Sequence, residues 1–597
     1  MKKKVQERAV TAIQLVFIGI WIANLKYTDS YFSVYALCCV AAVIGLWERY
    51  TYSEIPLATS RGTEIAVMIL SAFFSLAVVL ANHNIFHRLR DMSDISMETN
   101  EFMNKFDAVC TWVGGVFVGS NILSYLLRHF PSEISSDYTS RKVSERNKPG
   151  RFFSCVFGSI CLINLIYLFF VTYPGSVSGD SIWQIKQIAS GAYVNNHPFW
   201  HTMIIKFFMQ IGYALFGDAN AAAATYSAGQ IFIMAACFAY AMVTLYQMGI
   251  PNFWLSIAYA MYAFLPHNIT YSATMWKDVL FGGAMLLSVI SALRIIRKVG
   301  KHKGLDYMLF FIGGIGSCTL RTNGWVSMLI AALFMIPMLW KKEKVLAFTL
   351  VGVLFAGWIM VGPAFTWLNV GKTDVSEAFS VPLQQVSRVI AKGRELTDEE
   401  VELLSQIVDL EEIAEIYDES VSDKIKDAVR SKDRAYFDEH LGEYASLWIQ
   451  LGMRYPGDYL EAWIELTKGF WNGGYDYYIY AEYVKENPFG IYMKQQTNLI
   501  HKLVKAYFTF SREAVFFEPL QSIGLHVWLM IMLYFLCAVH KRPETVLFVP
   551  CFIIILGLWL GAPVYSQFRY VYPIFTAYPL LLPVALHSPE TTLENRN

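Results

Sequence analysis

Long apolar runs constrain this chain most, because about 20 consecutive apolar residues are enough to cross a bilayer as a helix. Only 16% of the 597 residues are charged and another 16% are aromatic, whereas soluble domains carry about a quarter charged residues and aromatic side chains gather at membrane interfaces. The sequence therefore predicts an all-α polytopic membrane protein with about 14 transmembrane helices. The expected spans lie at about 9–25, 31–48, 64–82, 106–127, 151–172, 221–247, 254–275, 279–293, 305–320, 325–340, 345–367, 524–540, 545–562 and 570–587.

Charge and cysteine content exclude two other classes of protein. The 48 basic residues balance the 48 acidic ones, so the chain has no overall positive field for binding nucleic acid. The nine cysteines all lie in apolar runs, and none forms a Cys-x-x-Cys pair. This indicates small buried side chains and not a disulfide framework or a thiolate metal site.

Basic turns between the runs set the expected orientation, because cytoplasmic loops of membrane proteins are enriched in Lys and Arg. Such residues cluster at 128–151, 294–303, 341–344 and 541–542. All of these turns can be cytoplasmic only if the apolar run at 199–216 does not cross, so we expect an interfacial or re-entrant helix there. Both termini are then cytoplasmic, and the expected location is the cell membrane, with the functional site extracytoplasmic.

The expected organisation has four regions, listed here in chain order: four N-terminal helices at 1–150, a transmembrane core at 151–370, a polar extracytoplasmic segment at 371–522, and three C-terminal helices with a cytoplasmic tail at 523–597. The polar segment holds 18 Asp or Glu against nine Lys or Arg at 372–440, with apolar residues at helical spacing. One interpretation is a mainly helical cap on the membrane face. The alternative is that this cap also lines a groove for an acceptor, that is, a substrate that receives a transferred group. The candidates for an acceptor contact are Glu377, Gln384, Gln385 and Arg388.

The first polar cluster follows the helix expected at 151–172. Pro174 and Gly175 end that helix and make a loop, so Asp180 lies near the membrane surface. A carboxylate there can act as a general base, or can hold a cation or an acceptor hydroxyl. The alternative, which the local sequence by itself favours, is that Asp180 caps a helix at 181–188 by accepting backbone N–H bonds.

Two further clusters lie near the same surface. His197 and His201 are four residues apart, a spacing that can serve a metal, but Pro198 begins the next helix and leaves His197 at its cap. His197 is therefore expected to donate a hydrogen bond to substrate. Lys277 and Asp278 open the helix at 279–293, where Lys277 can bind a phosphate and Asp278 can cap the helix or meet a metal. A plain Lys–Asp ion pair is the alternative.

Two arginines complete the set. Arg321 and Arg569 lie at the external ends of expected spans, away from the basic cytoplasmic turns. A guanidinium can bind a phosphate through two parallel hydrogen bonds, so an anionic lipid headgroup is the natural ligand. For either arginine alone, ordinary contact with membrane phosphates explains the position better.

The order of these clusters resembles the GT-C superfamily of membrane glycosyltransferases, and looks closest to its uncharacterised bacterial members. The similar features, over about 150–367, are a loop with a key Asp (Asp180), a His-Pro that opens a helix ending in Phe-Gly (197–217), a Pro-containing helix leading to Asp278, and an Arg-Thr-Asn-Gly turn at 321–324. The chain departs from the family in having a single acidic residue in the first loop, additional N-terminal helices, and no recognisable sugar-binding motif in the polar segment.

The resemblance implies a GT-C-like core with interfacial helices in its first external loop, and inverting transfer of a sugar from a polyprenyl-phosphate donor. Asp180 would take the proton of the acceptor hydroxyl. Lys277, Arg321 and Arg569 would neutralise the departing phosphate. The other substrate-binding residues would be Asn196, His197, Asp278, Asn323 and Tyr570. The acceptor would be an envelope polysaccharide, a teichoic acid or a lipid, and a divalent cation is a possible cofactor.

Two other functions stay open. A transporter or flippase of a lipid-linked envelope glycan would show internal repeats and polar residues at mid-membrane. The sequence has no evident repeat and its polar clusters lie at one face, which favours an enzyme. A scaffold for envelope assembly would make the segment at 371–522 the functional part and would leave Asp180 dispensable.

Overall fold

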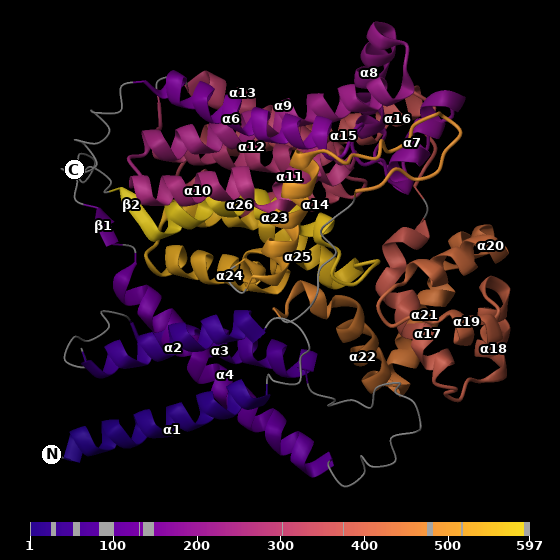
Figure 1. The fold of residues 1–597 in the computed structure, drawn as a ribbon. Coiled ribbons are helices and arrows are strands. Elements are labelled where there is room, and N and C mark those ends of the chain that lie inside the picture. The colour runs from indigo at the N-terminus through magenta and orange to yellow at the C-terminus, as the bar shows by residue number, and fades with distance from the viewer. Residues whose placement is uncertain are drawn as a thin grey trace.

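The computed structural model describes residues 2–24, 32–51, 60–82, 101–130, 132–134, 148–300, 303–373, 375–473, 482–514 and 517–589. Helices make up most of this chain (Figure 1). The N-terminal helices are α1 (Lys2–Asn24), α2 (Phe32–Thr51), α3 (Arg61–Asn82) and α4 (Glu101–His129). A three-residue strand after them, β1 (Ser132–Ile134), pairs in parallel with β2 (His587–Pro589) near the other end of the chain.

A second and larger group of helices forms the main bundle. Its members are α6 (Pro149–Phe170), α9 (Ala219–Gln247), α10 (Asn252–Phe264), α12 (Lys277–Arg297), α13 (Lys303–Thr319), α14 (Gly324–Trp340), α15 (Lys344–Val361), α24 (Ile523–Val539), α25 (Val549–Gly561) and α26 (Phe568–Leu586). Further elements at its ends are α7 (Gly179–Ser190), α8 (Phe199–Phe216), α11 (Pro266–Ser272), α16 (Pro363–Trp367), α23 (Leu499–Glu513), η5 (Glu518–Gln521) and η6 (Pro543–Phe548).

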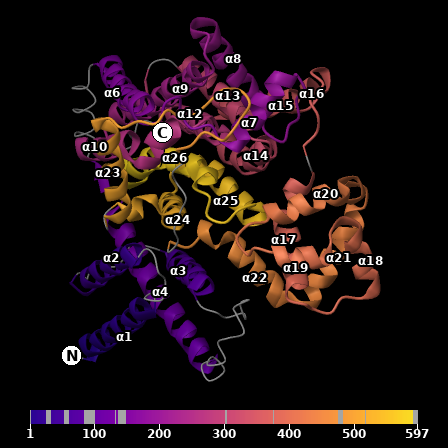
Figure 2. The same ribbon diagram turned by 45° about the vertical axis from the view of Figure 1, so that its right-hand side comes forward.

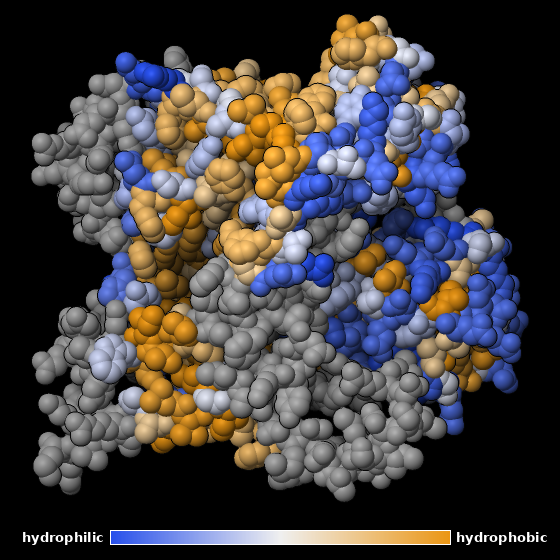
Figure 3. Space-filling model, viewed as in Figure 1, coloured by the Kyte–Doolittle hydropathy of each residue, from blue (hydrophilic) through white to orange (hydrophobic). Residues whose placement is uncertain are grey.

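Seven of the described helical segments are long and apolar enough to cross a membrane. They are Arg61–Ala81, Ala108–His129, Pro149–Phe170, Ala219–Gln247, Lys277–Arg297, Lys344–Trp367 and Pro543–Gly561. Apolar side chains cover much of the bundle surface, whereas polar ones gather toward the α7 end and over the helices of residues 375–473 (Figure 3). The protein is therefore a helical membrane-spanning protein, and each of these seven coincides with a span predicted from the sequence.

The remaining predicted spans are not among these seven. Shorter apolar helical stretches lie at Val10–Trp21, Cys38–Trp47, Gly324–Trp340 and Ile523–Val539, and α26 is one helix of 19 residues over the span predicted at 570–587. The span predicted at 254–275 consists of two helices, because the chain is extended at Leu265 and a new helix begins with Pro266. Proline lacks the N–H that would continue the first helix.

The run at 199–216 is a single helix, α8, and it is not among the seven candidate spans. It projects from the end of the bundle in Figure 1, with Phe207, Tyr213, Leu215 and Phe216 exposed. The expectation that this run does not cross the membrane stays a prediction.

Helix α12 is the centre of the bundle. Of the candidate spans it is the most buried, with 83% of its apolar window inside the structure. Glycines bring α13 against it, because a Cβ at Gly313 would lie 2.7 Å from Ala284 O and one at Gly316 would lie 2.7 Å from Ala284 Cβ. The N-terminal helices pack in the same way, since Gly115 and Gly119 of α4 face Ser75 and Ser71 of α3.

Residues 375–473 form a helical unit beside α25 (Figure 2). Its elements are η3 (Val375–Phe379), α17 (Ser380–Ala391), α18 (Asp398–Ile407), α19 (Leu410–Ile416), α20 (Asp423–Glu439), α21 (Leu441–Arg454), α22 (Pro456–Thr467) and η4 (Lys468–Phe470). The unit has its own apolar core, which includes Leu404, Ile413 and Leu451. The predicted mainly helical segment is therefore present.

The side chains suggested as acceptor contacts serve the helical unit itself. Glu377 pairs with Lys426 at 3.0 Å and also with Arg430. Arg388 pairs with Glu461 at 2.7 Å, and Gln385 donates to Tyr459 O at 3.0 Å. Gln384 also bonds within the unit, to Asp418 O. These contacts stabilise the helices of the unit against one another.

Candidate functional site

The loop between α6 and α7 is joined by main-chain hydrogen bonds to the turn before α12. The Ser176 N–H donates to Ala273 O and the Met275 N–H donates to Ser176 O, both at 2.9 Å. The Ser181 hydroxyl then donates to Met275 O. These bonds bring the start of α7 next to the start of α12, although the two helices are far apart in the sequence.

A second segment lies along the other side of the same loop. We name residues 482–498, which precede α23, the strap. The Val177 N–H donates to Tyr483 O at 3.0 Å, and the Lys485 N–H donates to Val177 O at 2.8 Å. Further along, the Lys494 N–H donates to Tyr173 O at 3.0 Å. The strap therefore forms part of the site.

Asp180 lies in the first turn of α7 and does not cap it. The helix begins at Gly179 with Ser178 as its N-cap, so the alternative that Asp180 caps a helix from 181 is wrong. The reason is long-range: Asp180 Oδ2 accepts hydrogen bonds from Arg569 Nη1 at 2.9 Å and Lys277 Nζ at 3.3 Å. Two cations from other helices compete successfully with local backbone donors.

His197 completes this charge network. Lys277 Nζ lies 3.1 Å from His197 Nδ1, and Asp180 Oδ2 lies 4.0 Å from the same nitrogen. An ammonium group only donates, so Nδ1 must accept and the ring proton is on Nε2. Burial, together with the charge of Lys277, lowers the pKa of His197 to about 4, which keeps the imidazole neutral at neutral pH.

The charge state of Asp180 follows from the same neighbours. Burial by itself would raise the pKa of the carboxyl, but the charges of Lys277 and Arg569 outweigh it and hold the pKa of Asp180 well below its usual range. The carboxylate is therefore ionised and ion-paired. A carboxylate in this state is a weak base until its cations are occupied by something else.

A second ion pair lies beside the first. Arg321 Nη1 is 3.5 Å from Asp278 Oδ1, and the Asp278 residue is only 1% exposed. Neither carboxylate oxygen of Asp278 has a hydrogen-bond partner among the described residues. Tyr570 lies between the two arginines, with Arg321 Cζ 5.4 Å and Arg569 Cζ 5.0 Å from its ring centroid. Arg569 Nη2 also donates to the Tyr570 hydroxyl at 3.2 Å.

The two asparagines occupy turns around this network. The Thr322 hydroxyl lies 3.4 Å from Asn196 O and donates to it, which joins the Arg-Thr-Asn-Gly turn to the segment before α8. Asn323 is the N-cap of α14, without a side-chain capping bond. The structure thus brings Asn196 and Asn323 near the charge network through their main chains, and neither side chain lines the cavity described next.

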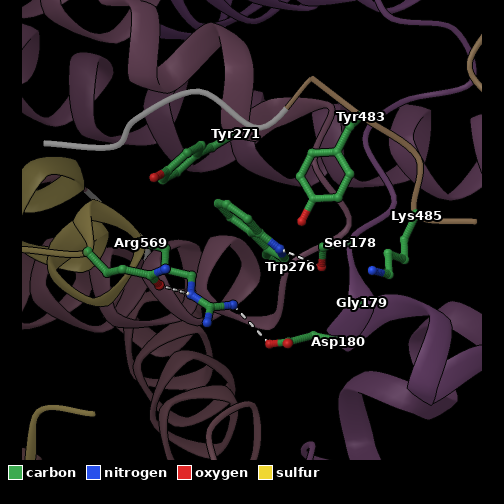
Figure 4. Close-up of a pocket in the computed structure, with 9 residues that line it drawn as sticks. Ser178, Gly179, Asp180, Tyr271, Trp276, Tyr483, Lys485 and Arg569 are labelled. Atoms are coloured by element: carbon green, nitrogen blue, oxygen red, sulfur yellow. Dashed lines mark hydrogen bonds and ion pairs between the residues drawn. The ribbon is translucent and has the colours of Figure 1, made fainter. Parts of the chain in front are cut away.

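A cavity of about 320 Å³ opens beside Asp180 (Figure 4). Its lining residues are Ser178, Gly179, Asp180, Tyr271, Trp276, Tyr483, Lys485, Gln567 and Arg569. The Trp276 ring is fixed by its Nε1–H, which donates to Ser178 Oγ at 2.8 Å, and Arg569 Cζ lies 5.3 Å from the ring centroid. In Figure 4 Tyr483 and Lys485 reach toward the cavity from the strap.

Sequence reasoning missed most of this lining. Of the nine lining residues it proposed only Asp180 and Arg569. Trp276 adjoins the predicted Lys277–Asp278 pair, and that proximity was a usable signal. Tyr483 and Lys485 carry no local signal, because the strap reaches the site through a pairing of Val484 with Val177, 307 residues earlier in the chain.

The described residues offer no metal centre of the usual kind. They contain no group of three or more His, Cys, Asp or Glu side chains placed to hold an ion. His201 is fully buried, and its ring nitrogens contact Gln184 Oε1 at 3.0 Å and the Tyr226 hydroxyl at 2.8 Å. It therefore ties α7 and α9 to α8 and does not form a pair with His197.

Comparison with known proteins gives one match. A family model described as "Family of unknown function (DUF6020)" matches residues 187–597, which is more than half of the chain. No curated protein and no solved structure matches. The matched region contains His197, Lys277, Asp278, Arg321 and Arg569, whereas Asp180 lies just before it.

Proposed function

Because the chain belongs to DUF6020, a family of unknown function, its activity has to be inferred from the cavity, and we propose that it transfers a sugar from a polyprenyl-phosphate carrier to a cell-envelope acceptor. One observation carries the proposal: Lys277 and Arg569 converge on Asp180 at the wall of a cavity of about 320 Å³. The cavity lies at the end of a bundle of membrane-length helices. A lipid phosphate needs cations at that depth, and an acceptor hydroxyl needs a base.

The charge balance of the network supports an anionic donor. Three cations, Lys277, Arg321 and Arg569, face two carboxylates, Asp180 and Asp278. One positive charge is left over, which matches the single negative charge of a sugar phosphodiester. Both arginines can bind a phosphate through two hydrogen bonds.

The aromatic side chains support a sugar as the group transferred. Tyr271, Trp276 and Tyr483 line the cavity, and aromatic faces pack well against the C–H faces of a sugar ring. Gln567 and Lys485 supply polar contacts at the same wall. A volume of about 320 Å³ falls within the range of ~300–1,000 Å³ that is usual for small-molecule sites.

The reaction follows from these positions. The acceptor hydroxyl oxygen attacks the anomeric carbon, the bond from that carbon to the phosphate oxygen breaks, and the electron pair leaves with the polyprenyl phosphate. The acceptor proton goes to Asp180. Lys277, Arg321 and Arg569 stabilise the charge that develops on the phosphate. A single displacement of this kind inverts the anomeric configuration.

Donor binding prepares Asp180 for its role as a base. Before the donor arrives, Lys277 and Arg569 are both bonded to Asp180 Oδ2. A phosphate that binds these two cations takes their charge away from the carboxylate, and the pKa of Asp180 then rises toward the ordinary range. The base is therefore activated only when the leaving group is in place.

The distribution of basic residues supports an extracytoplasmic site. The end of the bundle opposite the cavity carries Arg294, Arg297, Lys298, Lys341, Lys342, Lys344, Lys541 and Arg542. Buried ion pairs join several helices there, such as Arg294 with Asp306 at 2.8 Å. Cytoplasmic ends of membrane proteins are the basic ones, so the cavity end is the outer one.

The decisive experiment supplies the purified protein, in lipid nanodiscs, with polyprenyl-phosphate sugars and envelope acceptors. Release of polyprenyl phosphate with a new glycosidic bond on the acceptor is expected. Arg569→Gln and Arg321→Gln are expected to weaken donor binding. The matched control is Arg454→Gln, since the contacts of Arg454, such as its pair with Glu400, lie within the helical unit. Movement of an intact lipid-linked glycan across vesicles, without cleavage, would instead establish the transporter.

A further inference from the structure

Helix α23 has one apolar face that packs against the bundle and further apolar side chains that the rest of the protein leaves exposed. Its sequence is LIHKLVKAYFTFSRE. Ile500, Val504, Tyr507 and Phe508 recur at helical spacing and pack in an apolar cluster with side chains of α6, α9 and α11. This face explains why α23 is held against the bundle.

A second apolar stripe on α23 points away from the bundle. Leu499, Leu503 and Phe510 are separated by four and seven residues, so they lie on one line along the helix. They are 70%, 60% and 57% exposed. The opposite face is polar and basic, and its members are His501, Lys502, Lys505, Thr509 and Arg512.

The position of α23 is fixed at the ends of two bundle helices. The Asn498 side chain caps α23 by accepting from the His501 N–H at 2.8 Å, and it donates to Phe170 O, at the end of α6, at 2.8 Å. The Tyr507 hydroxyl donates to Phe264 O, at the end of α10, at 2.6 Å. In both ribbon views α23 runs across the direction of the bundle helices (Figures 1 and 2).

The exposed stripe continues an apolar surface that already belongs to the bundle. Phe169 and Phe170, at the end of the candidate span α6, are 47% and 46% exposed. Phe264, where Tyr507 is bonded, is 47% exposed. A helix that lies across the ends of membrane spans, with one apolar and one basic face, has the pattern of a helix embedded in the plane of a lipid interface.

We propose that α23 is a membrane-surface helix whose Leu499, Leu503 and Phe510 stripe inserts into the acyl region of the leaflet at the cavity end, with Lys502 and Arg512 facing lipid phosphates. The partner is the bilayer itself. This inference is independent of the proposed sugar transfer.

The arrangement has a consequence for the cavity. Asn498 ends the strap and caps α23, and the strap also binds to the helix through Glu482, which pairs with Lys505 and accepts from the Tyr167 hydroxyl at 2.8 Å. Since Tyr483 and Lys485 lie on the strap, a membrane-embedded α23 fixes that wall of the cavity at headgroup depth. A substrate with a lipid anchor then reaches the cavity without leaving the membrane.

The test is a depth measurement on the full chain in lipid nanodiscs. Nitroxide labels are attached to single cysteines in place of Leu503 and Phe510, with Lys502 and Thr509 as matched controls on the polar face. The background is Cys155→Ala, because Cys155 is the exposed one of the described cysteines. Collisions with oxygen, which concentrates in acyl chains, are compared with collisions with a water-soluble nickel chelate.

Oxygen collisions are expected to dominate at Leu503 and Phe510, and nickel collisions at Lys502 and Thr509. Nickel-dominated collisions at all four positions would overturn the inference, because the stripe would then face water. Strong spin–spin broadening at Leu503 would also overturn it, since a second copy of the chain would then cover the stripe.

Discussion

At the scale of single residues, Asp180 is the proposed base and is also ion-paired with two cations, and without a ligand the ion pairs weaken it as a base. A base needs a proton affinity that matches its task, yet Lys277 and Arg569 hold the pKa of Asp180 well below its usual range, against the effect of burial. The same two cations are the proposed phosphate ligands. The carboxylate of Asp180 therefore binds the two cations until the donor phosphate takes its place on them.

Asp180→Asn is expected to separate these two roles. Turnover should fall by about 10²–10⁴-fold, because an amide takes up no proton. Donor binding should tighten by roughly tenfold, or about 1.4 kcal/mol, because Lys277 and Arg569 lose their competing carboxylate. Titration of the protein with a polyprenyl-phosphate sugar, followed by single-turnover kinetics, measures both quantities.

The control for that variant is Asp218→Asn. Asp218 caps α9 by accepting the Ala221 N–H at 2.7 Å, and Asn caps almost as well, so binding and turnover should both be unchanged. Weaker donor binding in Asp180→Asn would show that the carboxylate does not compete with the phosphate. Full turnover would remove Asp180 from the mechanism.

His197 gives a pH dependence whose sign can be worked out. Burial first, and then the charge of Lys277, lower the pKa of the folded imidazole to about 4 from 6.5. Between these two values the unfolded chain binds the extra proton, so the free energy of unfolding falls as the pH is lowered through that window. At about pH 5 the loss from this one group is roughly 2 kcal/mol.

His197→Gln tests this assignment, because a glutamine oxygen also accepts from Lys277 and does not titrate. The drop in Tm between about pH 7.5 and about pH 5 should be smaller in the variant than in the natural chain. An equal drop in both proteins would mean that the folded protein does not hold His197 neutral in this pH range.

At the scale of elements, the strap connects the cavity wall beside α7 to helix α23, which are distant in the sequence. It pairs with the loop before α7 at Val177 and it leads into α23. Lys485 lines the cavity and makes no ion pair with any carboxylate that the structure describes. It is therefore the cation best placed to meet a negative group on the acceptor.

Lys485→Gln is expected to raise the KM for an acceptor that carries phosphate or carboxylate by about three- to fivefold, because an exposed charge pair contributes up to about 1 kcal/mol. The KM for a neutral acceptor should not change. Lys494→Gln is the matched control, since Lys494 lies on the same strap over the Tyr173 ring, 5.4 Å from its centroid, and outside the cavity lining. Equal effects of the two substitutions would exclude a specific role for Lys485.

At the scale of the whole molecule, the two unlike ends of the bundle support the proposed orientation in the membrane. One end gathers basic turns and buried ion pairs such as Arg297 with Glu544. The other end carries the cavity, α8, α23 and the contacts of the helical unit with the loop before α26, where the Ser422 hydroxyl donates to Pro563 O at 2.8 Å. Positive residues favour the cytoplasm.

Single cysteines at exposed positions test this orientation in a Cys155→Ala background. A membrane-impermeant maleimide should label Glu399→Cys, on α18 of the helical unit, in intact cells. Lys342→Cys, in the turn between α14 and α15, should react only after the cells are permeabilised. The reverse pattern would place the cavity in the cytoplasm and would contradict an extracytoplasmic transfer.

The sequence by itself determined the helices and their polar ends. Apolar runs of sufficient length predicted the seven candidate spans, and the balance of basic turns predicted that α8 does not cross. Asp180, Lys277 and Arg569 also stand out in the sequence, because charged residues next to membrane spans are costly and need partners, and the structure brings these three side chains into contact. These conclusions rest on length, polarity and charge, which are local properties of the chain.

Only the tertiary structure decided what those residues contact. The local sequence favours Asp180 as a helix cap. In the structure it bonds instead to Lys277 of α12 and Arg569 of α26. Tyr483 and Lys485 enter the cavity because the strap pairs with Val177, a register that depends on backbone hydrogen bonds and leaves no pattern in side-chain types. Long-range main-chain pairing and the competition between local and distant partners depend on which segments meet, and that is settled only when the helices pack.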